Sequence, residues 1–425
     1  MLLKRDKIIL ICDQVIEFCL YLVIFTSIFS KAAVESFFSL AFTAYILKKV
    51  LSFLTNSRQP LLPPTKLDLP ILAFIGANVI SVMVSQNFIV SIKAFVTVVL
   101  ENIGFYLMTL ETILFQKKNK RRFFIEVILL TSLVIVLDAT FQYFTGKDIF
   151  RRFAMSGQRL TASLGSPNTF GAWLVLVTPL FCCWSIMVKI KNLILRRILI
   201  ILSFLLVLCI FLTYSRGAWL GFLVAALFIA AFKDKRIILS LLILVTFFSA
   251  LILVYPTSLP DFNIGYAKYS VLIRFNIWRE AVGLIKDYPF FGVGLKNYLT
   301  MIPKYQIHAF SNMTINEIGE STGISPHNGY LQIAAETGLI GLGCFIWLLW
   351  VLFKNGIRYL KRNPDPVLLG LLSGLIAFSV SAFFDNHLNK IGLSAMFWIM
   401  LGLAGSYLKK QRPHSRPNCL SANML

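Results

Sequence analysis

The sequence predicts an all-α, polytopic integral membrane protein, from its composition and its pattern of apolar runs. Hydrophobic residues make up 57% of the 425 residues, charged residues only 14%, and the mean hydropathy is +0.77. Soluble domains carry about 25% charged residues. Apolar runs long enough to cross a hydrocarbon core about 30 Å thick recur along the whole chain. Because backbone groups in lipid need partners within their own segment, we expect these runs to be helices.

The apolar runs predict about twelve transmembrane helices in one membrane domain that covers residues 1–425. They are expected near 8–29, 33–47, 69–85, 91–115, 123–144, 168–188, 198–214, 217–232, 237–255, 333–353, 366–384 and 391–408. The first run is too long for a signal peptide and has no clear cleavage site, so we expect it to remain as a helix.

The basic residues predict the orientation of these helices. About two thirds of the 41 Lys and Arg residues fall in the N-terminus, the C-terminal tail and alternate connections, for example "KKNKRR" at 117–122. Both termini are therefore expected in the cytoplasm. The net charge of +22 is mostly this topology signal, and because no soluble basic domain is apparent we expect membrane lipids, and no nucleic acid, as partners.

Two connections on the predicted outer face are long, and long ordered loops are usually functional. The larger, 256–332, is expected to contain short helices. The smaller, 145–167, carries four cations on the side that is normally poor in them: Lys147, Arg151, Arg152 and Arg159. Cations in this place either bind an anionic ligand or are simply tolerated.

Arg216 lies in the short outer turn "TYSRGAWLG" (213–221), at or just inside the predicted membrane interface. An ionisable residue at membrane depth is costly and often functional. The alternative is an arginine that extends to the interface and anchors the end of its helix.

The stretch "YSVLIRFNIWREAVGLIKD" (269–287) has helical periodicity. Its apolar seam is expected to comprise Val271, Phe275, Trp278, Val282 and Ile285. At about 100° per residue, Arg274 falls near the centre of that seam. The solvated face is expected to comprise Arg279, Glu280 and Lys286. Arg274 must then find an anion or a structural salt bridge, because a desolvated charge is unfavourable alone.

His327 stands where a polar loop enters an apolar helix, in "ISPHNGYLQIAAETGLIGLG" (324–343). Ser325 and Pro326 have the character of an N-cap and a first-turn proline, which places His327 in the first helical turn. The helix dipole there disfavours imidazolium, so a neutral imidazole is available as a general base. A helix N-terminus also attracts phosphate. The alternative is a histidine that only caps or packs.

Two other histidines compete with His327 for that role. His308 and His387 are also predicted on the outer face, and Asp385 lies close to His387 in the sequence, which suits a packed or bridging histidine. His414 is in the cytoplasmic tail and is excluded by its side of the membrane.

Acidic residues give no sign of a metal site. Glu336 lies on the far side of its helix from His327 and is expected to pack, whereas Glu317 and Glu320 suit one helix face. The outer loops contain no D-x-D motif and no His, Asp or Cys cluster with ligand spacing. We therefore predict no metal and no cofactor.

Several arginines and one candidate base on one face suit a membrane-bound substrate that carries a diphosphate. Arg binds phosphate in a bidentate manner. The chemistry would be displacement of the diphosphate by an acceptor hydroxyl, with the base taking the proton and the arginines stabilising the departing charge.

Four stretches together resemble the O-antigen ligase and O-antigen polymerase superfamily of bacterial membrane glycosyltransferases. They are "RLTASLGSPNTFGAWL" (159–174), "TYSRGAWLG" (213–221), "RFNIWREAVGLIKDYPFFGVG" (274–294) and "SPHNGYLQIAAETGLIGL" (325–342). The resemblance implies an inverting, metal-independent enzyme with a GT-C-type fold in the bacterial inner membrane. Its donor would be a glycan on undecaprenyl diphosphate and its acceptor lipid A–core, on the periplasmic face.

The resemblance also implies roles for residues. Arg216 and Arg274 match the arginines that engage the diphosphate, and His327 matches the base. Arg159 and Asn168 match a recurring motif that lines the glycan or lipid site, although "GSPN" stands here where "GNPN" is expected. Ser215 and Asn328, each next to a matched residue, are also expected to bind substrate.

Other functions remain open from the sequence. A polysaccharide polymerase would use the same donor with another lipid-linked repeat unit as its acceptor. Protein O-oligosaccharyltransferases share the motifs but often carry a further soluble domain. A transporter of lipid-linked glycans suits twelve spans, yet transporters usually place their site near the midplane and show internal repeats, which this sequence does not. A lipid-binding or scaffolding protein would leave the placement of Arg274 unexplained.

Overall fold

The computed structural model describes residues 2–54, 64–115, 120–188, 192–233, 264–305 and 325–409. Within these ranges every regular element is a helix, and the only β pairing consists of isolated bridges. Nine described helices are long and apolar enough to cross a membrane, and two more are apolar but shorter. The all-α, polytopic prediction is thus confirmed. The expected span 237–255 lies outside the described residues, so the count of twelve stays a prediction.

The helices follow the predicted apolar runs closely. Their bounds are α1 (Leu2–Thr26), α2 (Lys31–Leu54), α3 (Asp68–Met83), α4 (Phe88–Ala94), the π-helix η1 (Phe95–Leu100), α5 (Glu101–Phe115), α6 (Lys120–Thr145), α7 (Pro167–Met187), α8 (Leu193–Leu212), α9 (Arg216–Lys233), α11 (Ile264–Asp287), α12 (Tyr298–Met301), α14 (Gly329–Arg362), α15 (Pro366–Ser381) and α16 (Ile391–Gly405). Short 3₁₀ turns lie at Ala162–Leu164, Ile302–Tyr305, His387–Asn389 and Ser406–Leu408.

Polar side chains fix where several of these helices begin. Asn192 accepts the first free N–H groups of α8, and Asp365 does the same for α15, where Pro366 follows at the first position. Asn and Asp are strong N-caps because their side chains bind donors that the helix itself leaves unpaired. The caps explain why these apolar runs start abruptly after their polar connections.

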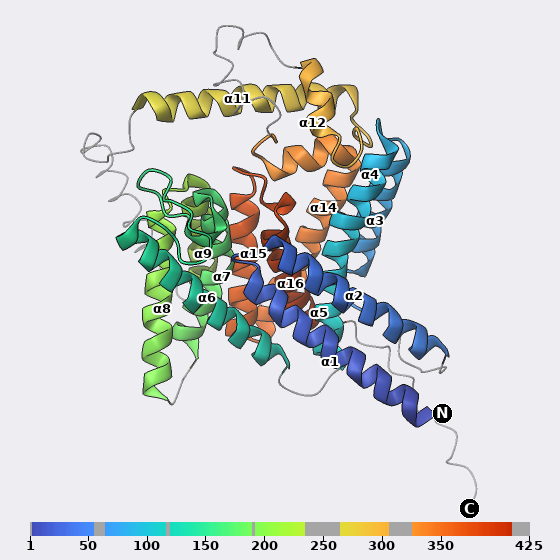
Figure 1. Cartoon of the computed structure of the whole chain (residues 1–425), viewed down its shortest axis with the longest axis vertical. Coiled ribbons are helices and arrows are strands. Elements are labelled where there is room, and N and C mark those ends of the chain that lie inside the picture. Colours follow the sequence, from blue (N-terminus) through green and yellow to red (C-terminus); the bar gives the residue numbers. More distant parts are fainter. Residues whose placement is uncertain are drawn as a thin grey trace, which may run out of the picture.

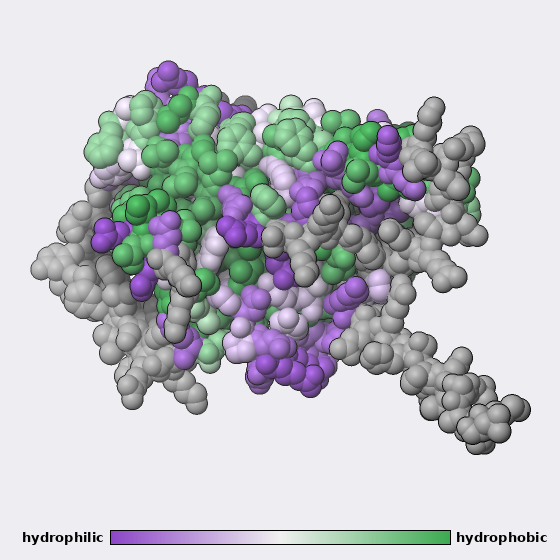
Figure 2. All heavy atoms as spheres, turned by 90° about the horizontal axis from the view of Figure 1, so that it is seen from below, coloured by the Kyte–Doolittle hydropathy of each residue, from purple (hydrophilic) through white to green (hydrophobic). Residues whose placement is uncertain are grey.

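The bundle is centred on α7, α15 and α16, and α11 lies across one end of it (Figure 1). We call that end the α11 end. Most of the side chains of α7 and α16 are buried, whereas α8 and α2 expose much of their apolar surface. An apolar exterior suits helices that face lipid. Seen from the opposite end, hydrophilic side chains gather over part of the surface, as expected for a face in contact with water (Figure 2).

Glycines allow the central helices to approach closely. A Cβ added at Gly374 of α15 would collide with the backbone carbonyl of Leu176 in α7, and one at Gly221 of α9 would collide with that of Ala377 in α15. Membrane helices associate through such small residues because lipid supplies no hydrophobic force between them. These contacts set the spacing of α7, α9 and α15, whose ends carry candidate site residues.

Gly374→Val is therefore expected to lower the free energy of unfolding by about 1–3 kcal/mol, because rotation of the valine side chain cannot relieve a collision with backbone atoms. Thermal unfolding of the purified protein in detergent measures this. Gly343→Val is the matched control, because Gly343 is an exposed glycine of α14 with no neighbour within 4 Å of an added Cβ. Equal melting temperatures for the two variants would show that the α7–α15 contact is not tight.

Helix α14 is kinked at Gly338, where φ is 71° and ψ is 179°. The kink frees backbone groups that then bind the segment that follows α11. The Leu339 N–H donates to the Pro289 carbonyl at 2.8 Å, and the Val293 N–H donates to the Ala335 carbonyl at 3.0 Å. The turn-rich "YPFFGVGL" stretch is thereby fixed against α14 and supports one side of the α11 end.

The predicted apolar seam of α11 is partly wrong. Phe275 is 61% exposed and Val282 is 40% exposed, whereas Glu280, expected on the solvated face, is only 6% exposed. Arg279 and Lys286 are exposed, as predicted. The buried face is rotated because α11 packs through Ala281, Leu284 and Ile277.

A small second core explains this rotation. It joins Ala281 and Leu284 of α11 to Tyr298, Ile302 and Ala335. These partners lie later in the chain, so the local period of the helix could not show which side they would cover.

Candidate functional site

A polar cavity opens at the α11 end between α7, α9, α11 and α15. We call it the arginine cavity, and it holds about 480 Å³ of space not filled by protein atoms. Its lining residues are Arg159, Asn168, Tyr214, Ser215, Arg216, Gly217, Arg274, Ser381, Phe384, Asp385 and His387. Five of the seven residues that the sequence singled out thus line one cavity.

Arg159 is held in place by bonds of its own. Its Nε donates to the Thr213 carbonyl at 3.0 Å, and its Nη2 donates to Asn168 Oδ1 at 3.1 Å. The loop that carries it is fixed by Gln142 of α6, which accepts the Thr161 N–H at 3.0 Å. Arg159 therefore joins the start of α7 to the turn before α9, and it brings positive charge to the cavity wall.

The start of α9 faces the same cavity. Ser215, which is 5% exposed, immediately precedes the helix, and Arg216 and Gly217 are its first residues. The start of α7 contributes Asn168. The N-terminal turn of a helix carries unpaired N–H groups and the positive end of the helix dipole, which together favour an anion. Arg216 is exposed, so its guanidinium is accessible to such a ligand.

Arg274 reaches the cavity from α11 and is half-buried. Burial lowers the pKa of its guanidinium, Asp385 raises it, and the like charge of Arg216 lowers it further. A guanidinium stays protonated even so. One turn further along α11, Trp278 Nε1 donates to the Pro326 carbonyl at 2.9 Å, which ties the helix to the segment that carries His327.

His327 lies just outside α14, so its predicted place in the first helical turn is wrong. The N-cap is Asn328, whose Oδ1 accepts the N–H groups of Tyr330 at 3.0 Å and Leu331 at 3.1 Å. Ser325, the predicted N-cap, stands three residues too early. Asn is at least as good an N-cap as Ser, and here it is the residue with extended backbone. His327 therefore does not experience the dipole of α14 as a first-turn residue would.

The carboxylate of Asp385 orients the His327 side chain. Its Nδ1 lies 3.3 Å from Asp385 Oδ1, and about a third of the side chain is exposed. Its backbone φ is +46°, in the left-handed region. Non-glycine residues in that region are uncommon and tend to cluster at functional sites.

Asp385 connects His327 to the arginine cavity, which it lines. It is 7% exposed, and Lys390 Nζ lies 3.9 Å away. Burial alone would raise the pKa of Asp385, but the hydrogen bond with His327 and the charge of Lys390 lower it well below its usual range. In the sequence Asp385 lies beside His387, whereas its contact with His327, 58 residues away, is visible only in the structure.

His387 is a packed histidine, in line with one of its two predicted roles. It is 1% exposed, its Nε2 lies 3.1 Å from Ser381 Oγ, and its Nδ1 has no hydrogen-bond partner among the described residues. Burial lowers its pKa to about 4. A histidine with so low a pKa is a poor base near neutral pH. His308 and His414 lie outside the described residues.

The remaining outer cations are spread over the surface. Lys147 and Arg152 are exposed and line no described cavity, while Arg151 lies over the Phe153 ring, 4.4 Å from its centroid. Arg151 and Lys390 line a separate pocket beside the start of α7. Of the four loop cations, Arg159 is thus the one that lines the arginine cavity.

The structure describes one of the three acidic residues considered above for a metal site, Glu336. Glu336 is 5% exposed and accepts a hydrogen bond from Gln332, so it packs, as expected. Glu317 and Glu320 lie outside the described residues. In the part of the chain that is described, no three His, Cys, Asp or Glu side chains form a group that could hold a metal ion.

Comparisons with known proteins agree with the predicted family resemblance. Residues 201–346 match the family model described as O-Antigen ligase, a range that includes Arg216, Arg274 and His327. The chain is 27% identical over 266 residues to the ComP-specific O-oligosaccharyltransferase of Acinetobacter baylyi, which covers 60% of this chain and 44% of that protein. It is 24% identical over 152 residues to the teichuronic acid biosynthesis protein TuaE of Bacillus subtilis, which covers 35% of this chain and 29% of that protein.

These matches confirm the resemblance to the O-antigen ligase superfamily. The chain spans less than half the length of each of the two curated relatives that it matches. Arg159 and Asn168 lie before the range of the family match.

Proposed function

We propose that this protein is a glycosyltransferase of the O-antigen ligase type. It transfers a glycan from undecaprenyl diphosphate to an acceptor hydroxyl, that of lipid A–core. One observation carries the proposal: Arg159, Arg216 and Arg274 converge on a single cavity, and Asp385 holds His327 beside it.

The arginine cavity suits a diphosphate because its charge is unbalanced. Asp385 is its one acidic lining residue, and it is already engaged by His327 and Lys390. The guanidinium groups of Arg216 and Arg274 bind phosphate oxygens, and the N–H groups at the start of α9 add to the attraction. The same groups stabilise the charge that develops on the leaving diphosphate.

His327 is the proposed general base. When its Nδ1 donates to Asp385, its Nε2 carries a lone pair that accepts the proton of the acceptor hydroxyl. The hydroxyl oxygen then forms a bond to the anomeric carbon. The bond from that carbon to the diphosphate oxygen breaks, and undecaprenyl diphosphate leaves with the electron pair. Asp385 acts as a positioning residue, because it stabilises the imidazolium that forms.

The α11 end is assigned to the periplasm of a bacterial inner membrane, with both termini in the cytoplasm. The distribution of Lys and Arg supports this orientation. A site at one end of the bundle also argues against a transporter, which would place its site near the midplane. A polysaccharide polymerase is the second candidate, since one relative is named for teichuronic acid biosynthesis.

Expression in a Gram-negative strain that lacks its own ligase tests the function. The strain carries a donor and core matched to the source organism. We expect O-antigen ladders on lipid A–core by gel electrophoresis with this protein and none with an empty vector. Longer glycan that stays on the lipid carrier would instead identify a polymerase. No change in any glycan, with the donor verified, would overturn both assignments.

A further inference from the structure

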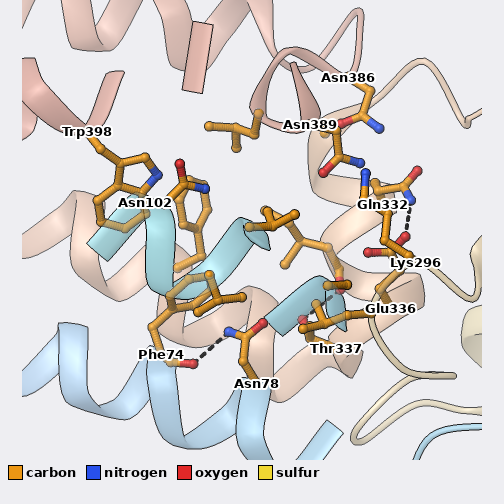
Figure 3. Close-up of a pocket in the computed structure, with 18 residues that line it drawn as sticks. Phe74, Asn78, Asn102, Lys296, Gln332, Glu336, Thr337, Asn386, Asn389 and Trp398 are labelled. Carbon is orange, nitrogen blue, oxygen red and sulfur yellow. Dashed lines mark hydrogen bonds between the residues drawn. The ribbon is translucent and has the colours of Figure 1, made fainter. Parts of the chain in front are cut away.

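A second cavity lies next to the arginine cavity and has no role in the chemistry described so far. We call it the amide pocket (Figure 3). It is formed by α3, η1, α5, α14, α16, the turn before α16 and the segment before α12, and it has about 70 Å³ of room for water-sized molecules. Its polar lining residues are Asn78, Asn102, Lys296, Gln332, Glu336, Thr337, Asn386 and Asn389.

The lining of the amide pocket suits sugar hydroxyls. Side-chain amides both donate and accept hydrogen bonds, as hydroxyls do. Asn386, Asn389 and Gln332 lie together at one side of the pocket, and Trp398 and Asn102 lie at the other (Figure 3). Such a mixture of amides and an aromatic ring matches a ligand with polar edges and apolar ring faces.

The charge of this pocket differs from that of the arginine cavity. Its lining includes one cation, Lys296, and one carboxylate, Glu336, which lie beside each other (Figure 3). The arginine cavity has three arginines and one carboxylate that is already engaged. The amide pocket therefore favours a neutral, hydroxyl-rich ligand over a second phosphate group.

Three unfavourable features meet at this pocket. The stretch Phe95–Leu100, which supplies Val98 and Val99 to the lining, is a π-helix. Lys296 has φ of +59°, and Gln332 Oε1 is buried with no hydrogen-bond partner among the described residues. π-Helices and strained residues gather at functional sites, and an unpaired buried oxygen is available to accept a hydrogen bond. A sugar hydroxyl would donate that hydrogen bond.

The turn between α15 and α16 separates the two cavities. Asp385 and His387 line the arginine cavity, whereas Asn386 and Asn389 line the amide pocket. Gly329, two residues after His327, also lines the amide pocket. In a direct displacement, the attacking oxygen approaches opposite the leaving group. A diphosphate in the arginine cavity and an acceptor sugar in the amide pocket would lie on different sides of this turn, and Asp385 of the turn contacts His327.

We infer that the amide pocket is the subsite for the acceptor sugar, an inference that rests on the proposed function. Asn386, Asn389 and Gln332 bind its hydroxyls, and Trp398 packs against its ring. The pocket would then determine which acceptor is used, while the arginine cavity recognises only the diphosphate that all donors share.

Binding measurements with two ligands and two variants test this assignment. Full-length protein in lipid nanodiscs is titrated with undecaprenyl diphosphate, and separately with two glycans: core oligosaccharide from a strain without O-antigen, and the free repeat-unit oligosaccharide. For Asn389→Ala we expect the Kd for the accepted glycan to rise roughly three- to tenfold, the loss of one hydrogen bond, with no change for undecaprenyl diphosphate. For Arg274→Ala we expect the Kd for undecaprenyl diphosphate to rise and the Kd for the accepted glycan to stay unchanged.

Asn355→Ala is the matched control, because it removes an amide of α14 that lines neither cavity and bonds to the Val351 carbonyl. Asn386→Ala replaces Asn389→Ala if that variant misfolds. If the wild type binds neither glycan, or if glycan binding depends on Arg274 and not on either asparagine, the acceptor assignment is wrong. If the wild type fails to bind undecaprenyl diphosphate, the proposed function fails instead, and the glycan titrations still test the pocket.

Discussion

His327→Ala is expected to lower the rate of glycan transfer by roughly 10²–10⁴-fold, the usual contribution of a general base. The variant removes an imidazole that is partly exposed next to the arginine cavity and oriented by a buried carboxylate. Among the described histidines, His387 cannot replace it near neutral pH, because burial lowers its pKa to about 4. Initial rates with purified donor and acceptor measure the effect, and binding of undecaprenyl diphosphate should be nearly unchanged.

Ser325→Ala is the matched control for this variant. Ser325 is two residues from His327 and does not cap α14, because Asn328 does. We expect wild-type transfer from Ser325→Ala. Transfer by His327→Ala within a factor of about three of the wild type would rule out a base at this position, since general bases contribute far more.

Arg274→Ala is expected to weaken binding of undecaprenyl diphosphate by roughly 10- to 150-fold, the loss of a hydrogen bond to a charged group. The loss in kcat/KM should be at least as large, because the same guanidinium stabilises the leaving diphosphate. Arg274→Lys keeps the charge but loses the planar fork, so an intermediate defect is expected. Titration of the protein in nanodiscs and transfer kinetics measure the two effects.

Arg279→Ala separates this role from a general effect of positive charge. Arg279 lies on the same helix but is exposed to solvent and lines no described cavity. We expect donor binding by this variant to match that of the wild type. Equal defects in the two arginine variants would mean that α11 acts through its overall charge, and that the arginine cavity does not hold the diphosphate.

The membrane helices were predictable because hydrophobic length is a local property. The run near 168–188 corresponds to α7 (Pro167–Met187), and the run near 198–214 corresponds to α8 (Leu193–Leu212). The run near 91–115 was predicted as one helix, but it corresponds to three consecutive elements: α4, the π-helix η1 and α5. A π-helix differs from an α-helix in one hydrogen-bond offset, which hydropathy does not record.

The sequence predicted helix α11 correctly, but it predicted the buried face of this helix less well. Helical period identified an apolar stripe, but Phe275 and Val282 on that stripe are exposed and Glu280 is buried. Arg274 still reaches the arginine cavity, because Trp278 fixes α11 to the backbone of Pro326. The period of a helix reveals that it has two faces, whereas its packing partners decide which of them is covered.

The sequence by itself determined the all-α membrane architecture and pointed to Arg159, Asn168, Ser215, Arg216 and Arg274. Composition and hydrophobic length suffice for the architecture, because both depend on residues close together in the chain, whereas Asn168 and Ser215 were identified through the resemblance to the O-antigen ligase superfamily. Only the tertiary structure placed Asp385 against His327, 58 residues away, and opened the amide pocket on the other side of the same turn. Such contacts arise when α11, α14 and α15 pack together, and no local pattern encodes which of their ends will meet.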